Sequence, residues 1–171
     1  MIRYLITLFT LASVLQQLTG CASPARLEPA DLDRLTGAPW VGTLTYLDYS
    51  SQKTTTIDSS LVVRRVEEEP PAWEIGVGYS KEPHADSKEL VVLRDGGRLL
   101  DEQRIVSREV LANGDLVFVM EARGEDNNRP AVFRFEHRIA AGEYSRRKMV
   151  RFEDGQGDGE FFQRHVYRWK R

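Results

Sequence analysis

Basic side chains recur along the last third of the chain, in segments where polar and apolar residues alternate. Arginine presents a planar fork of donors that matches carboxylate and phosphate groups, so a cluster of these residues is suited to holding an anion. The alternative is an outer sheet face on which each arginine forms a weak ion pair with glutamate. The basic residues concerned are Arg134, Arg138, Arg146, Arg147, Lys148, Arg151, Arg164 and Arg168.

Aromatic residues along the chain are candidates for lining a pocket together with one of these cations. Large aromatic side chains also build packed cores, and a barrel of about eight strands holds at most one small ligand. The volume left inside the fold therefore decides between a pocket and a core. The predicted ligand-binding residues are Tyr46, Trp73, Tyr79, Phe118, Phe133, Tyr144 and Arg147.

Residues suited to covalent or metal chemistry do not converge in the sequence. No serine lies in a Gly-x-Ser-x-Gly motif, and His84, His137 and His165 lack the short spacing of zinc ligands. Residues 154–159 resemble part of a calcium loop, but Gln156 and His165 stand where carboxylate ligands are expected. We interpret this segment as a turn, and we predict a protein that is not an enzyme and holds no metal or cofactor.

From Trp40 onward, hydrophobic and polar residues alternate with the period of two that is typical of β-strands. Turn signals such as Asn113-Gly114 and Asp95-Gly96-Gly97 separate the runs. A short helical turn is predicted over residues 29–35, with a proline at its start and a glycine after its end. The predicted strands cover residues 40–49, 54–66, 72–79, 89–94, 99–110, 116–122, 131–140, 144–152 and 160–170.

Short links between these runs predict an all-β fold. We expect an antiparallel up-and-down meander that closes into a barrel of about 8–10 strands, because closure removes exposed sheet edges. A sandwich of two sheets is the alternative. In the last strand, alternation places His165, Tyr167 and Trp169 on one face, and Arg164 and Arg168 on the opposite, basic face.

Residues 1–20 have the pattern of a secretory signal. Arg3 supplies a positive charge, and the apolar run Leu5 to Leu15 is shorter than the about 20 residues that span a bilayer. The run leads to Leu18-Thr19-Gly20-Cys21, which resembles the lipobox of bacterial lipoproteins. The resemblance implies acylation of Cys21 and, because Ala22 follows it, anchorage to the outer membrane of a Gram-negative bacterium on its periplasmic side. The alternative is an ordinary secreted protein with a stray cysteine.

A short helical turn, Gly37 and Trp40 at the start of the first strand, and an arginine-rich last strand with Trp169 follow the anchor. This arrangement is similar to the calycins, the superfamily of lipocalins and fatty-acid-binding proteins. The resemblance implies that Trp40 closes the floor of a barrel and that Arg164 or Arg168 stacks on it.

The chain has 171 residues, a net charge of −2 and one cysteine. Without the signal, its length suits one domain, and its balanced charge argues against nucleic-acid binding. We divide it into a signal peptide (1–20), a tether (21–28) and a barrel (29–171). We expect a membrane-anchored, non-enzymatic protein whose barrel binds a small apolar or anionic ligand. The alternative is a solidly packed barrel that serves as an interaction module in an envelope protein complex.

Overall fold

The structure is a computed structural model that describes residues 25–155 and 159–171. The predicted signal peptide, the lipobox with Cys21 and the first part of the tether lie outside the described residues.

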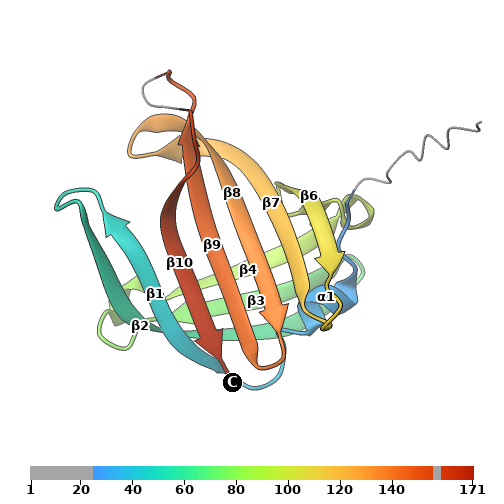
Figure 1. Cartoon of the computed structure of the whole chain (residues 1–171). Coiled ribbons are helices and arrows are strands. Elements are labelled where there is room, and N and C mark those ends of the chain that lie inside the picture. Colours follow the sequence, from blue (N-terminus) through green and yellow to red (C-terminus); the bar gives the residue numbers. More distant parts are fainter. Residues whose placement is uncertain (1–24, 156–158) are drawn as a thin grey trace, which may run out of the picture.

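Within the described ranges, ten antiparallel strands form one closed barrel (Figure 1). The strands pair in chain order, and β1 pairs with β10 to close the sheet. The strands are β1 (Trp40–Asp48), β2 (Lys53–Glu68), β3 (Pro71–Gly78), β4 (Ser87–Arg94), β5 (Leu99–Leu100), β6 (Gln103–Val110), β7 (Leu116–Asp126), β8 (Arg129–Ala140), β9 (Glu143–Phe152) and β10 (Phe162–Lys170).

Closure confirms the predicted up-and-down barrel, and the alternative of two face-packed sheets is wrong. The decisive pairing runs from Val41 opposite Lys170 to Tyr46 opposite His165. This ladder joins the first strand to the last and so closes the sheet, while β4 and β6 are joined only through the two-residue strand β5.

One predicted strand is interrupted. The run 99–110 forms β5 and β6, with a tight turn at Asp101, whose φ is 53°. The Asp101 backbone N–H donates to the Val92 carbonyl, and the Asp101 carboxylate accepts from the Val92 N–H at 2.9 Å. These two bonds to β4 fold the chain back where the alternation alone predicts a continuous strand.

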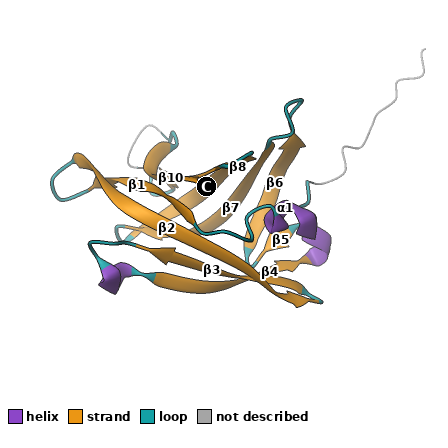
Figure 2. Ribbon diagram, turned by 90° about the horizontal axis from the view of Figure 1, so that it is seen from below, coloured by secondary structure: helices purple, strands orange, loops and turns teal. Residues whose placement is uncertain are grey.

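A short helix, α1 (Pro29–Asp33), lies against one end of the barrel (Figure 2). Pro29 begins the helix, and the Asp31 carboxylate accepts a hydrogen bond from the Glu28 N–H at 2.8 Å. The same carboxylate accepts two bonds of 2.7 Å from the Arg108 guanidinium. The two hydrogen bonds from Arg108 therefore fix the helix to β6.

The inner face of β3 follows the predicted alternation. Trp73 and Val77 are buried in the core, and Ile75 and Tyr79 pack against it. On β8 and β9, register pairs Phe133 with Val150, Phe135 with Lys148, and His137 with Arg146. Two neighbouring inward positions of β9, Arg146 and Lys148, are thus cationic.

Candidate functional site

Trp40 forms the floor of the barrel. It is fully buried, its indole N–H donates to the Leu35 carbonyl at 2.8 Å, and its ring meets that of Tyr144 edge-on. The guanidinium carbon of Arg171 lies 4.1 Å from the Trp40 ring centroid, and Arg171 also donates to the carbonyls of Thr36 and Arg34. The arginine that stacks on Trp40 is thus Arg171, and the expectation of Arg164 or Arg168 is wrong. Arg171 follows the last strand, where alternation no longer fixes the direction of a side chain.

A polar layer lies above this floor. Arg146 is paired in register with His137 on β8 and with Tyr167 on β10, and its guanidinium lies 4.9 Å from the Tyr167 ring centroid. The hydroxyls of Tyr167 and Tyr79 are 2.6 Å apart. Arg146 Nε and His137 Nε2 are buried without a hydrogen-bond partner in the described part of the chain. A guanidinium in this environment is a positive charge that burial disfavours unless an anion compensates it.

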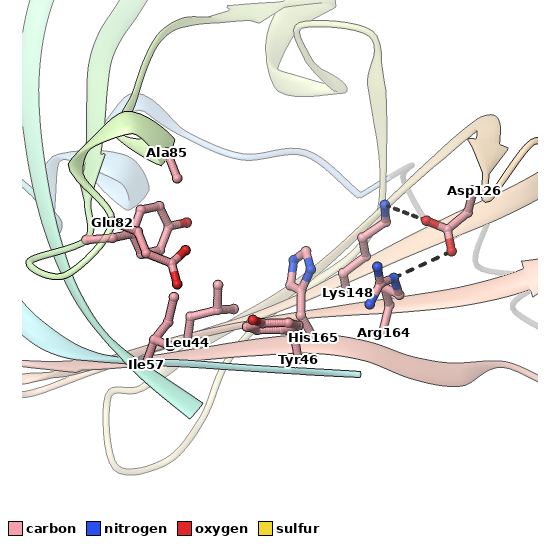
Figure 3. Close-up of a pocket in the computed structure, with 10 residues that line it drawn as sticks. Leu44, Tyr46, Ile57, Glu82, Ala85, Asp126, Lys148, Arg164 and His165 are labelled. Carbon is pink, nitrogen blue, oxygen red and sulfur yellow. Dashed lines mark ion pairs between the residues drawn. The ribbon is translucent and has the colours of Figure 1, made fainter. Parts of the chain in front are cut away.

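The end of the barrel away from the floor contains a cavity of about 350 Å³ (Figure 3). Leu44, Ile57 and Ala85 give it an apolar part, and two tyrosines line it as well, Tyr46 and Tyr79. A volume near 350 Å³ is in the range of small-molecule pockets. The cavity therefore leaves room for a small ligand, which a solidly packed barrel would not.

One wall of the cavity carries a cluster of charges. Lys148 Nζ lies 3.9 Å from Asp126 Oδ1, and Arg164 Nε lies 3.7 Å from Asp126 Oδ2 (Figure 3). Glu82 also lines the cavity, but it lies on the side away from Lys148 and Arg164, so it does not neutralise them (Figure 3). At His165, the positive charges of Arg146, Lys148 and Arg164 act together against the negative charge of Asp126. The interior is therefore electropositive on this side.

A β-bulge places Arg164 in the cavity. The register between β9 and β10 shifts between Gln163 and His165, so Arg164 is an extra residue that breaks the alternation. Its side chain is 24% exposed, lies over the Tyr49 ring and donates to the Leu47 carbonyl. The prediction that Arg164 shares the outer, basic face with Arg168 is therefore wrong.

Burial and the cations control protonation inside the barrel. Desolvation, followed by the positive charges of Arg146 and Lys148, lowers the pKa of His165 to about 4. Desolvation also holds the pKa of His137 well below its ordinary value, and it lowers the pKa of Lys148. At neutral pH both histidines are uncharged, so they add no positive charge to the cluster.

The predicted ligand-binding residues lie in different parts of the barrel. Tyr46 and Tyr79 line the cavity, and Phe133 lies beneath Lys148, whose Nζ is 3.9 Å from the ring centroid. Phe133 and Phe135 also line a second hollow of about 810 Å³ beside the turn at Asp101. The residues that belong to the packed core are Trp73, Phe118 and Tyr144.

Arg147 lies on the outer wall, where it pairs with Glu136 at 3.2 Å, so it does not reach the cavity. Its neighbour Lys148 does, together with Asp126, Arg164 and His165. The sequence does indicate that Lys148 faces inward, because it is four residues after inward-facing Tyr144 in an alternating strand. Alternation in the sequence predicts neither the bulge at Arg164 nor the position of Asp126 in the cavity.

The segment that resembles a calcium loop is partly described. Asp154 accepts two hydrogen bonds from the Arg129 guanidinium, at 2.6 and 2.9 Å, while residues 156–158 lie outside the described part. Across residues 25–155 and 159–171, no group of three histidine, cysteine or acidic residues is placed to hold a metal ion. No helix in those ranges is long and apolar enough to cross a membrane.

Comparison with models of known protein families finds no match to this chain. A search of curated proteins likewise finds no match.

Proposed function

We propose that the barrel binds a small molecule with an anionic group and a short apolar part. The observation that carries this proposal is the cavity of about 350 Å³ with Lys148 and Arg164 on one wall and Leu44 and Ile57 nearby. The cations would hold the anionic group, and the apolar residues would cover the rest of the ligand. Arg146, deeper in the barrel and without an ion pair among the described residues, adds to the attraction. The cavity favours ligand binding over a role as a solidly packed interaction module.

Lys148 and Arg147 provide a matched test, because they are adjacent cations on opposite sides of the β9 wall. We expect Lys148→Met to weaken hexanoate binding by about tenfold to a hundredfold, since a hydrogen bond to a charged group contributes about 1.5–3 kcal/mol. Arg147→Met removes the same charge from the outer surface, and we expect it to leave the affinity nearly unchanged. Calorimetric titration of the full chain in a neutral detergent measures both affinities.

Two results of this titration would count against ligand binding in the cavity. One is an equal loss of affinity in the two variants, which would indicate a general effect of net charge. The other is equal binding of hexanoate and hexan-1-ol, which would show that the anionic group is not recognised. Native mass spectrometry of the protein made in bacteria would also show whether an anionic molecule copurifies.

We further propose that the barrel is held at the periplasmic face of the outer membrane through an acylated Cys21. Support comes from the motif Leu18-Thr19-Gly20-Cys21 after a short apolar run. The single cysteine of the chain would then be the attachment site, and it precedes the residues that form the barrel. Acyl chains give stable anchoring when at least two are present.

We expect Cys21→Ser, expressed in a Gram-negative bacterium, to accumulate as an unlipidated precursor that retains residues 1–20. Ser23→Ala keeps the motif and should be processed as the wild type is. Intact mass and membrane fractionation distinguish the two forms. A Cys21→Ser protein with the mass change of the serine substitution alone, relative to a processed wild type, would refute the anchor.

A further inference from the structure

The carboxylate of Asp126 occupies the place where an anionic ligand would meet the cations. It lies within 3.9 Å of Lys148 Nζ and 3.7 Å of Arg164 Nε, and the Tyr49 hydroxyl donates a hydrogen bond to it. The side chains are largely buried, with 13% of Asp126 and 18% of Lys148 exposed. Within the cavity, the chain thus already supplies an anion to its own cations.

Asp126 is brought there by strands that do not neighbour one another. It ends β7, directly before a turn in which Asn127 and Asn128 have φ values of 51° and 59°. Tyr49 follows β1, and three strands, β8, β9 and β10, separate β1 from β7 in the barrel. The bond from Tyr49 to Asp126 therefore links two hairpins across the open end of the barrel.

We propose that Asp126 is a specificity-determining residue, whose carboxylate lies at the head-group position and is displaced when a ligand binds. This inference rests on the proposed function. A ligand with a carboxylate or phosphate group replaces the lost ion pairs with Lys148 and Arg164. A neutral ligand that displaced Asp126 would leave two largely buried cations without a partner, which is costly. Asp126 thus selects for anions whose oxygens resemble those of a carboxylate.

Competition from Asp126 also sets the affinity. The ligand binds only the fraction of molecules in which the cations are released, so its apparent affinity falls by that fraction. Removing the internal carboxylate should consequently strengthen the binding of an anion, although a residue of the cavity wall has been lost. A residue that only shaped the cavity or contacted the ligand directly would have the opposite effect.

We expect Asp126→Asn to raise the affinity of the full chain for hexanoate by about tenfold. It should also raise the affinity for hexyl phosphate and should not raise that for hexan-1-ol. The ratio between the two anions shows whether the natural head group is a carboxylate or a phosphate. Glu136→Gln is the matched control, because it removes one negative charge from the outer wall, where Glu136 pairs with Arg147. Calorimetric titration in a neutral detergent gives all of these affinities.

An unchanged or lower hexanoate affinity in Asp126→Asn overturns the role of Asp126, and so does an equal gain in Glu136→Gln. In either event, the proposed function still stands if the wild type binds hexanoate and Lys148→Met weakens that binding. If neither wild type nor Asp126→Asn binds either anion, the proposed function fails as well.

A second variant tests the same role if Asp126→Asn does not fold, as judged by circular dichroism. Tyr49→Phe keeps every charge and keeps the ring beneath Arg164, but removes one of the contacts that hold Asp126 in the cavity. We expect hexanoate to associate with this variant several-fold faster in stopped-flow measurements. An association rate equal to that of the wild type overturns the proposal.

Discussion

Replacing Trp40 by alanine is expected to lower the free energy of unfolding of the barrel by about 3–5 kcal/mol, the usual cost of deleting a buried tryptophan. The side chain is fully buried, and it joins the floor to the helix end through its bond to the Leu35 carbonyl. Alanine leaves a cavity between Tyr144 and Arg171, and the Leu35 carbonyl loses its indole donor. Urea denaturation followed by circular dichroism measures the loss.

Two further variants localise this effect to the floor. Val41, the next residue on the opposite face of β1, is 65% exposed, so Val41→Ala should change the free energy of unfolding by less than about 0.5 kcal/mol. Arg171→Met should lose about 1–2 kcal/mol, because it removes a cation–π contact and two hydrogen bonds to carbonyls. A loss below about 1 kcal/mol in Trp40→Ala would show that Trp40 does not stabilise the floor of the barrel.

The architecture was predictable because it depends on patterns that repeat within each strand. The alternation from Trp73 to Tyr79 places the same four side chains inward in the structure, and Asn113-Gly114 lies in the turn between β6 and β7 as expected. Short hairpins between such strands favour a closed meander over a sandwich. Local periodicity and turn chemistry were therefore enough for the fold.

The site was predictable only in part, because single-residue irregularities decide which cations face inward. A bulge of one residue reverses the face of Arg164, and no residue type in the sequence marks its position. Lys148, by contrast, could have been predicted in place of Arg147, since alternation from inward-facing Tyr144 already places Lys148 inward. Asp126 could not be assigned from the sequence, because its partner Tyr49 is 77 residues away and on a strand that does not neighbour β7.

Acid is expected to destabilise the barrel between about pH 6.5 and pH 4.5 through two interior histidines. The pKa of His137 and that of His165 both lie below the ordinary value of 6.5 in the folded protein. In this window the unfolded chain therefore binds protons that the folded chain does not, so stability falls as the pH falls. Each histidine contributes a slope of up to about 1.4 kcal/mol per pH unit, which gives a slope of up to about 2.7 kcal/mol per pH unit for the pair. For His165 the slope ends near pH 4, where the folded protein also takes up the proton.

The variant His165→Gln should remove about half of this slope, because it deletes one of the two groups and leaves His137 in place. His84 is exposed on the 3₁₀ turn before β4, so His84→Gln serves as a control and should leave the slope as in the wild type. The hydrogen bond from Arg138 lowers the pKa of Asp115 below its ordinary value of 3.8, so this carboxylate stays ionised above pH 4.5. Urea unfolding at pH 7, 6, 5 and 4.5 measures the slopes for the three proteins. A free energy of unfolding that stays constant across this range would mean that the two imidazoles are as easily protonated in the folded barrel as in water. The interior would then be wetter, and its cations better screened, than the packing around Arg146 indicates.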